Sequence, residues 1–210
     1  MTTISDFRPA ALADRARALA DQGGRRVIVG VVGAPGAGKS TIAAAVAAEL
    51  GSAAVVVPMD GFHYPTAILR DLGRADRKGA PDTFDVAGYV ALLEQLRRDH
   101  DHIVRAPWFD RETDEPVADR LVVPPSVPIV ITEGNYLLLP SSGWDRVRGL
   151  LDEAWYVRAE EQVRLQRLIE RHRRFGKDEA AARAWATGPD EANAALIEAT
   201  QGAADLIIRY

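Results

Sequence analysis

The feature that most constrains the fold of this sequence is a continuous apolar run, Val27–Val32 (VIVGVV), followed at once by the glycine-rich run Gly33–Ser40 (GAPGAGKS). Apolar residues without alternation are typical of a strand that is buried on both faces of a parallel sheet. The alanine-rich segment after Ser40 ends near Gly51 and predicts a helix. Parallel strands need a crossover connection, which is usually a helix, so this order of segments predicts an α/β fold.

The remainder of the chain continues the alternation of strands and helices. Helical spacing of apolar residues predicts helices at 8–20 and from Val86 to Leu96, the second with Asp85 as its N-cap. Further apolar runs predict buried strands at residues 53–57, 127–132, 154–157 and 206–208. This alternation predicts a three-layer α/β fold in a single domain that covers residues 1–210.

Two stretches interrupt the alternation. Residues 103–123 predict an antiparallel excursion, because two apolar segments flank the polar turn from Asp110 to Pro116. Residues 171–190 mix basic side chains with Gly176 and Gly188, a composition that is typical of a mobile lid.

Composition narrows the class of protein. The 210 residues are 47% apolar, with no cysteine and a formal net charge of −4. The apolar content excludes a disordered chain, and the lack of cysteine excludes disulfides and thiol nucleophiles. A mildly acidic balance disfavours nucleic acid as a partner, because binding to a phosphate backbone needs a basic surface. No apolar run approaches the roughly 18 residues that span a bilayer, and no signal-peptide pattern is present, so we expect a cytoplasmic protein without a membrane partner.

The glycine-rich run fits the pattern G-x-x-x-x-G-K-[ST] and lies between a predicted strand and a predicted helix, the context that this pattern requires. Glycines let the backbone curl so that several N–H groups point at one anion, and the helix N-terminus adds the positive end of its dipole. Lys39 would reach the β- and γ-phosphates of ATP, and the Ser40 hydroxyl would bind Mg²⁺. The predicted nucleotide-binding residues are Gly33, Ala34, Pro35, Gly36, Ala37, Gly38, Lys39, Ser40 and Thr41.

A phosphate-binding loop alone leaves kinases, GTPases, motor ATPases and transporter subunits open. The guanine-reading N-K-x-D pattern and the LSGGQ signature of transporter ATPases are both absent from the sequence. Asp60 follows a predicted buried strand, so it should open onto the same crevice as the loop. A carboxylate there can orient an acceptor hydroxyl and take its proton. The alternative for Asp60 is a turn residue before Gly61.

Other candidate residues follow predicted strands. Glu133 ends the apolar run IVITEG and needs a partner, either Mg²⁺ with its water shell or a basic side chain in an ion pair. His63 and Tyr64 are candidates to line an acceptor pocket, although His63 can instead be hydrogen-bonded within its own loop. Trp108 and Phe109 can stack on a base or sugar, or belong to the core.

A helix predicted from Glu160 to Phe175 carries a stripe of arginines. These fall at i, i+3, i+7 and i+10 and are Arg164, Arg167, Arg171 and Arg174. Guanidinium groups on one stripe can hold transferring phosphates. Glu160 and Glu170 each lie four residues before an arginine of the stripe, so a solvated, salt-bridged face is the alternative.

Five motifs occur together in this chain: GAPGAGKS, MDGFHYPTAIL, RKGAPDTFD, APWFD and ITEGNYLLL. Their order closely resembles the uridine kinase, phosphoribulokinase and type I pantothenate kinase branch of P-loop kinases. Within this branch the sequence looks most like bacterial members described as nucleoside kinase-like or fructose-transport-system kinase-like. The resemblance implies a mainly parallel five-stranded sheet with a helical lid, ATP with Mg²⁺, and phosphorylation of a small hydroxylated metabolite.

The resemblance also implies roles for particular residues. Asp60 matches the family's catalytic aspartate, and Glu133 matches its acidic residue at the metal. These kinases bring arginines from the arginine-bearing helix and the lid to the phosphates. That implies catalytic roles for Arg167 and Arg171 beside Lys39, and a nucleotide contact for Arg173.

Residues of the acceptor site follow the resemblance less closely. Phe109 with Asp110 is similar to an aromatic–Asp pair of uridine kinases, which lack the KGAPDTFD stretch. Pantothenate kinases have a histidine two positions after an aromatic residue, where this chain has Arg111 after Phe109. Asn193 resembles an acceptor-binding asparagine of pantothenate kinases. The expected acceptor site consists of Asp60, His63, Tyr64, Phe109, Arg111 and Asn193.

We therefore expect an ATP-dependent kinase that phosphorylates a hydroxyl of a nucleoside or sugar. A pantothenate kinase-like enzyme is the alternative with the same chemistry. An NTP-hydrolysing enzyme or switch and a non-catalytic nucleotide-binding regulator are the alternatives from other classes. The expected partner is a small hydroxylated molecule and not a nucleic acid, and a homodimer stays open.

Overall fold

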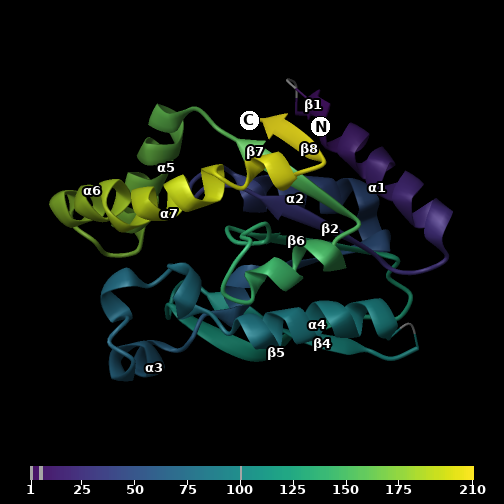
Figure 1. Cartoon of the computed structure of the whole chain (residues 1–210), viewed down its shortest axis with the longest axis horizontal. Coiled ribbons are helices and arrows are strands. Elements are labelled where there is room, and N and C mark those ends of the chain that lie inside the picture. The colour runs from purple at the N-terminus through teal and green to yellow at the C-terminus, as the bar shows by residue number, and fades with distance from the viewer. Residues whose placement is uncertain (1, 5–6, 100) are drawn as a thin grey trace.

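The computed structural model describes residues 2–4, 7–99 and 101–210 and is built around a six-stranded sheet (Figure 1). The strand order is β1-β8-β7-β2-β6-β3, and all paired neighbours run parallel. The strands are β1 (Thr2–Ile4), β2 (Val27–Val32), β3 (Ala54–Pro58), β6 (Ile129–Gly134), β7 (Glu153–Arg158) and β8 (Leu206–Arg209). Strand β2, which leads into the glycine-rich run, therefore lies inside the sheet between β7 and β6.

Helices cover both faces of this sheet, which confirms the three-layer α/β fold. Successive residues of β2 point to opposite faces, because side chains alternate along a strand. Val29 packs in one apolar cluster with residues of α1 (Pro9–Gly23) and α2 (Lys39–Leu50). Ile28 packs in the other cluster, with residues of α4 (Val86–Arg98). The expected N-cap of α4 is confirmed, since the Asp85 side chain accepts a hydrogen bond from the Gly88 amide.

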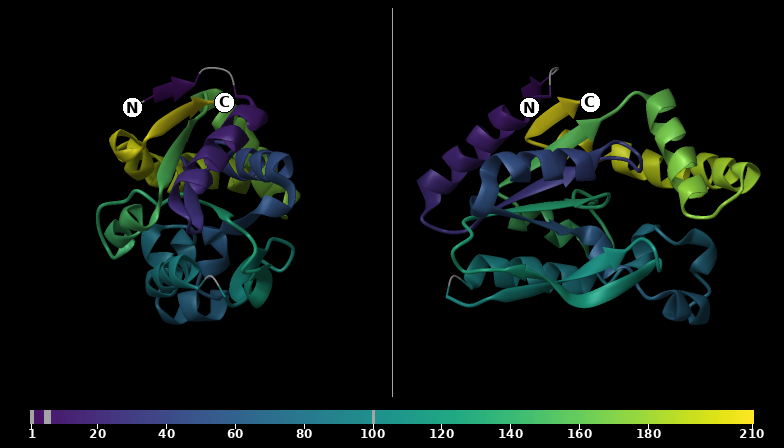
Figure 2. Two further views of the ribbon diagram at one scale, coloured as in Figure 1. Left: turned by 90° about the vertical axis from the view of Figure 1, so that its right-hand side faces the viewer. Right: turned by 180° about the vertical axis from the view of Figure 1, so that it is seen from behind.

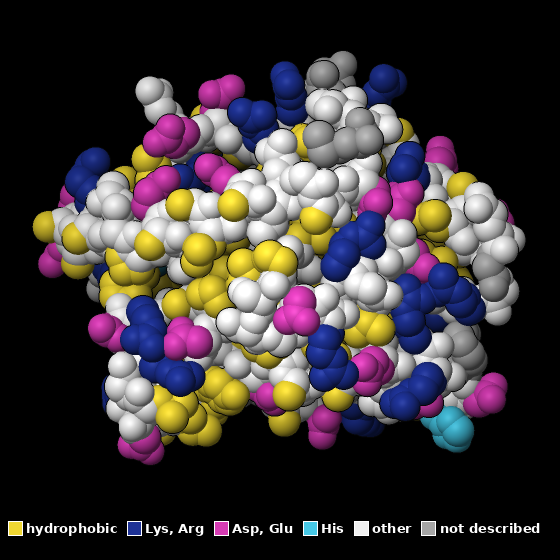
Figure 3. All heavy atoms as spheres, viewed as in Figure 1, with side chains coloured by type: hydrophobic (Ala, Val, Ile, Leu, Met, Phe, Trp, Pro, Cys, Tyr) yellow, Lys and Arg dark blue, Asp and Glu magenta, His cyan; other side chains and the backbone are white. Residues whose placement is uncertain are grey.

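The remaining helices gather toward one end of the molecule (Figures 1 and 2). They are α3 (Thr66–Asp71), α5 (Glu161–Arg174), α6 (Glu179–Thr187) and α7 (Pro189–Glu198). Short 3-10 turns occur at Gly51–Ala53, Met59–Phe62, Ala75–Arg77, Pro81–Thr83, Trp144–Arg146, Arg148–Leu150 and Gln201–Ala203. Apolar side chains reach the surface over the α3 end in Figure 3, where Ile68 and Leu72 are 43% and 48% exposed.

A separate antiparallel ribbon interrupts the α/β order, as predicted for residues 103–123. It consists of β4 (Val104–Asp110) and β5 (Glu115–Val123), with an irregular register between Ala106 and Trp108. The ribbon runs beside α4 below the main sheet in Figure 1. At its tip Asp114 has φ of 56°, a left-handed conformation that Asp tolerates better than most residues. The tip therefore turns tightly between the two strands.

The sheet has one strand more than the expected five. The five strands predicted from apolar runs are all present as β2, β3, β6, β7 and β8. The sixth, β1, is three residues long and pairs only with β8, at the edge of the sheet. Its sequence, TTI, is too short and too polar to carry a strand pattern, so only the tertiary pairing reveals it.

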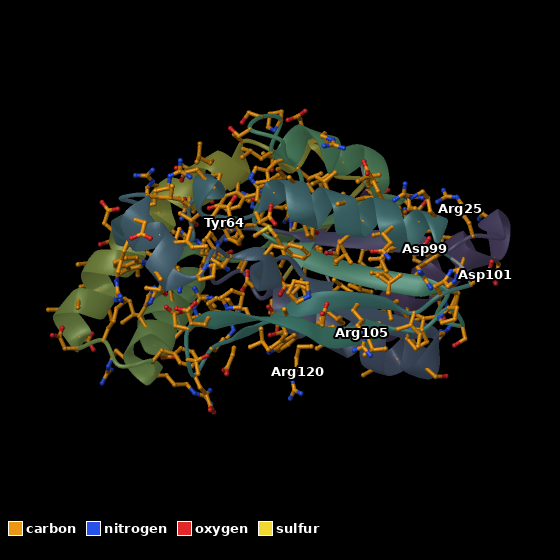
Figure 4. All side chains as sticks on the ribbon, turned by 90° about the horizontal axis from the view of Figure 1, so that it is seen from below. Arg25, Tyr64, Asp99, Asp101, Arg105 and Arg120 are labelled. Atoms are coloured by element: carbon orange, nitrogen blue, oxygen red, sulfur yellow. The ribbon has the colours of Figure 1, made fainter. Side chains whose placement is uncertain are left out.

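Arg26, immediately before β2, is a buried cation with an exposed fraction of 2%. Its guanidinium donates hydrogen bonds of 3.0 Å to the backbone carbonyls of Leu96, Asp99, Pro124 and Val127. These bonds join the end of α4 to the segment that leads into β6. The neighbouring Arg25, labelled with Asp99 in Figure 4, has a half-exposed side chain and pairs with Asp152, which also accepts hydrogen bonds from the Ile28 amide and from Arg97.

The substitution Arg26→Met should lower the free energy of unfolding by about 2–4 kcal/mol, because four carbonyls lose a charged donor. Arg25→Met, the matched control, removes one exposed partner of an ion pair and should cost less than about 1 kcal/mol. Urea unfolding followed by circular dichroism measures both values. Equal losses in the two variants would contradict the structural role given to Arg26.

Candidate active site

The turn between β2 and α2 is shaped by glycines. Gly36 and Gly38 have φ of 79° and 97°, in the region where residues with a Cβ are strained. Both are also closely packed. A Cβ on Gly36 would lie 2.7 Å from the carbonyl oxygen of Arg164, and a Cβ on Gly38 would lie 2.5 Å from the Tyr210 ring. Gly36 and Gly38 are therefore required both by the backbone conformation and by the close packing around them.

The first residues of α2 bring a lysine and a hydroxyl to the site. Lys39 is 8% exposed, and its Nζ donates to the carbonyl oxygen of Ala34 at 3.0 Å. Burial lowers the pKa of Lys39 to about 8, against the opposing charges of Glu133 and Asp60. Ser40 Oγ donates to Glu133 Oε1 at 2.9 Å. A hydroxyl and a carboxylate oxygen this close form a donor set that suits Mg²⁺, and the N-terminus of α2 suits a phosphate.

Two carboxylates meet at the ends of neighbouring strands. Glu133, near the end of β6, is in register with Val31 of β2 and Pro58 of β3, so it lies between the two strands. Burial, reinforced by the negative charge of Asp60, raises the pKa of Glu133. Burial also favours the neutral form of Asp60, but the electrostatic influence of the neighbouring His63 ring and of the Arg111 guanidinium outweighs it and holds the pKa of Asp60 below its ordinary value.

His63 lies beside Asp60 and is satisfied within its own loop. Its Nδ1 is 2.8 Å from the Asp60 carbonyl oxygen, and its ring packs against those of Phe84 and Phe109 at centroid distances of 4.0 and 4.8 Å. Burial lowers the pKa of His63. The ring still lines the cavity described next, whereas the side chain of Tyr64, labelled in Figure 4, is not part of the cavity wall.

Most of the predicted site residues line a cavity of about 970 Å³, here called the main cavity. These are Pro35, Lys39, Ser40, Asp60, His63, Phe109, Arg111, Glu133, Arg171 and Asn193. A smaller crevice of about 470 Å³ shares several of these side chains and adds Gly36, Gly38, Thr41 and Arg167. Residues far apart in the sequence therefore meet in front of the glycine turn.

The arginines of α5 have different environments. Arg164 is 3% exposed and pairs with Glu191 of α7, so it joins two helices instead of pairing with Glu160. The guanidinium of Arg167 lies 5.0 Å from the Tyr210 ring centre, and its Nη1 is buried with no hydrogen-bond partner in the described part of the chain. A buried donor without a partner is costly and suits a ligand anion. Arg171 lines both cavities, and burial lowers its pKa.

Arg173 lines neither of the two cavities, in contrast to the expectation of a nucleotide contact. Its Nη1 pairs with Glu179 of α6 at 3.1 Å, and both side chains are more than half exposed. Helical geometry explains the difference, since residues two apart on a helix point in different directions.

Sequence reasoning also missed several residues of the cavity wall. Lys78 lies in the quoted RKGAPDTFD motif, and its Nζ donates to Asp114 Oδ2 at 2.7 Å. His172 of α5 and Asp190 of α7 also line the main cavity, and His172 Nε2 lies 2.7 Å from Asp190 Oδ2. The motif was a usable signal for Lys78. No local pattern marks His172 and Asp190, because 18 positions separate them in the chain.

Comparison with known proteins identifies the family of the chain. The Phosphoribulokinase / Uridine kinase family pattern matches residues 28–210. A Schizosaccharomyces pombe protein described as a candidate uridine kinase is 38% identical over 160 residues, which cover 70% of this chain and 67% of that protein. A pantothenate kinase of Limosilactobacillus reuteri is 32% identical over 139 residues, which cover 63% of this chain and 45% of that enzyme.

A solved structure covers nearly the whole chain. The crystal structure of a candidate fructose transport system kinase from Silicibacter sp. TM1040 matches with a TM-score of 0.86 at 38% identity, over 96% of this chain and 99% of that one. The chain belongs to the phosphoribulokinase/uridine kinase family, and its fold is that of P-loop kinases. Among the described helices, none is long and apolar enough to cross a membrane.

The different surroundings of Arg167 and Arg173 lead to a binding prediction. Arg167→Met should weaken ATP binding about tenfold or more, because a charge-assisted hydrogen bond to phosphate is lost. Arg173→Met, the matched control on the same helix, should bind ATP within about twofold of the wild type, since an exposed ion pair contributes little. Isothermal titration calorimetry with Mg·ATP measures both affinities. An unchanged affinity for Arg167→Met would remove this side chain from the nucleotide site.

Proposed function

We propose that this protein is an ATP-dependent kinase that transfers the γ-phosphoryl group to a hydroxyl of a small metabolite, such as a nucleoside or a sugar. The observation that carries the proposal is that one cavity brings Asp60 together with Lys39, Ser40 and Glu133. Phosphate-binding groups and an acceptor-binding carboxylate in one cavity are what a kinase needs. Membership of a kinase family supports the same reaction.

In this proposal the nucleotide is held by the glycine turn and the start of α2. The backbone N–H groups of the turn hold the phosphates, and Lys39 neutralises their charge. Ser40 and Glu133 hold Mg²⁺, directly or through its water shell. Bound Mg²⁺ would neutralise charge that develops on the phosphates during transfer. Arg167 and Arg171 approach the same phosphates from α5.

Asp60 orients the acceptor. Its lowered pKa keeps the carboxylate ionised at neutral pH, so it can accept a hydrogen bond from an acceptor hydroxyl. During transfer the acceptor oxygen forms the new bond to phosphorus, and its proton passes to Asp60. The bond between phosphorus and the bridging oxygen breaks, and ADP leaves with the electron pair. A mainly dissociative transition state needs positioning by Asp60 more than it needs a strong base.

The helices beyond Arg171 form the proposed lid. Residues 171–190 contain the end of α5, all of α6 and the first residues of α7. Gly176, with φ of 96°, separates α5 from α6 and supplies a flexible joint. Closure of this segment would exclude water from the transferring phosphoryl group.

A pantothenate kinase-like reaction is the second candidate. It is favoured by the similarity to the pantothenate kinase of Limosilactobacillus reuteri. It is also favoured by Asn193, which lies on the cavity wall, where its Nδ2 donates to the Gly79 carbonyl oxygen at 3.4 Å. Acceptor-dependent release of ADP, measured over nucleosides, sugars and pantothenate, tests both candidates. ADP release that no acceptor stimulates would instead favour a hydrolase or switch, and Mg·ATP binding without turnover would favour a regulator.

Asp60→Asn should reduce kcat for phosphoryl transfer by about 10²–10⁴, because the variant keeps the shape but loses the charge and the proton acceptor. The affinity for Mg·ATP should change by less than about threefold, since Asp60 faces the acceptor in this account. Steady-state kinetics on the best acceptor of the screen, with calorimetry of Mg·ATP binding, measures both quantities.

The matched control is Asp14→Asn, an exposed aspartate of α1 that pairs with Arg17 on the surface. It should leave kcat unchanged. Asp60→Asn with more than a third of the wild-type transfer rate would return Asp60 to the role of a turn residue. A large loss of Mg·ATP affinity would make it a metal ligand instead.

A further inference from the structure

Arg111 holds the carboxylate that the proposed reaction needs. Its Nη2 lies 2.9 Å from Asp60 Oδ2, with the two side chains 43% and 25% exposed. Both residues line the main cavity and the smaller crevice. An acceptor hydroxyl that approaches Asp60 must therefore share or replace this contact.

The tip of the β4–β5 ribbon, residues 111–114, fixes Arg111 in this place. Next to it, Lys78 Nζ donates to the carbonyl oxygen of Asp114 at 2.6 Å and to its Oδ2 at 2.7 Å. The Glu115 carboxylate accepts from the Thr66 amide at 3.2 Å. These bonds tie the tip to the segment that follows Asp60. Arg111 is therefore part of a built cavity wall and not the end of a free loop.

The cavity carries positive charge beyond what Asp60 balances. Arg171 lines it as well, and within the described residues no ion pair or hydrogen bond holds its guanidinium. Burial and then the charge of Arg111 lower the pKa of Arg171, so the two cations interact electrostatically. Around the whole main cavity, seven lysine and arginine side chains line the wall against five carboxylates, so the wall carries an excess of positive charge. The phosphates of ATP can pair with Arg171 on α5, and a second anionic group can pair with Arg111 on the β4–β5 ribbon.

We propose that the acceptor itself carries an anionic group, a phosphate or a carboxylate, and that Arg111 binds this group. The inference rests on the proposed kinase function and names the substrate class for it. The anionic group of the acceptor binds Arg111 and so breaks the ion pair between Arg111 and Asp60. The freed Asp60 carboxylate then accepts a hydrogen bond from the acceptor hydroxyl. During transfer the acceptor oxygen bonds to the γ-phosphorus, its proton passes to Asp60, and ADP leaves. A neutral acceptor leaves the Arg111–Asp60 pair closed and must compete with it. The planar guanidinium fork matches both phosphate and carboxylate oxygens.

The test compares pairs of acceptors in which one hydroxyl or hydroxymethyl group of the neutral member is replaced by a phosphate or a carboxylate. Acceptor-dependent ADP release is measured at saturating Mg·ATP with four pairs: ribose and ribose 5-phosphate, fructose and fructose 6-phosphate, glycerol and glycerate, and pantothenol and pantothenate. We expect the best acceptor to be an anionic member, with kcat/KM at least about tenfold above that of its neutral partner. The phosphate and carboxylate pairs separate the two kinds of anion.

The variant Arg111→Gln should lower kcat/KM for the anionic member about 10–100-fold and change that for its neutral partner less than about threefold. Arg105→Gln, the matched control, alters an exposed arginine on the same ribbon, labelled in Figure 4, and should change neither. A neutral member that equals or exceeds its anionic partner overturns the inference and leaves the kinase proposal standing. So does an equal loss for both members in Arg111→Gln, which would place Arg111 at the transferring phosphoryl group.

A binding measurement keeps the inference testable if no acceptor is phosphorylated, a result that counts against the proposed function. Thermal unfolding with Mg·ADP is then recorded with each member of the four pairs. The inference predicts that an anionic member raises Tm more than its neutral partner in the wild type and not in Arg111→Gln. No difference between the members of any pair would overturn it.

Discussion

The contact between helix α5 and the glycine turn is the interaction on which the site depends. A Cβ at Gly36 would meet the Arg164 carbonyl oxygen at 2.7 Å, so the helix lies directly against the turn. Arg164 also reaches the Pro35 carbonyl oxygen at 3.5 Å and pairs with a glutamate of α7. Because α5 is held at Arg164, the arginines one and two turns further on face the same cavity. The same packing thus positions Arg167 and Arg171 and connects the turn to α7.

The pKa values of two neighbouring carboxylates, Glu133 and Asp60, shift in opposite directions because their surroundings differ. Glu133 lies within β6, between two strands, so burial raises its pKa and Ser40 is its hydrogen-bond partner. Asp60 lies two residues beyond the end of β3 and contacts Arg111 on the cavity wall, so nearby positive charge lowers its pKa. This difference supports the division of labour proposed for them, with Glu133 at the metal and Asp60 at the acceptor.

The elements that depend on short-range sequence patterns were predictable from the sequence. Continuous apolar runs predicted the buried strands, and Asp85 predicted the start of α4, because burial pattern and capping depend on neighbouring residues. Contacts between distant segments were not predictable. The partner of Arg164 is on α7 rather than one turn away, and Arg173 faces Glu179 instead of the cavity. The ion pair between Arg111 and Asp60 joins residues 51 positions apart, which no periodicity encodes.

The central claim is that phosphoryl groups pass from ATP to a small hydroxylated molecule. The most direct test incubates the protein with ATP that carries ¹⁸O on its γ-phosphoryl group and with a bacterial metabolite extract freed of macromolecules, followed by mass spectrometry. The account predicts that the label appears in a new phosphate ester of a small metabolite, in amounts that depend on the protein. Label found only in inorganic phosphate, at the same rate with and without the extract, would contradict it.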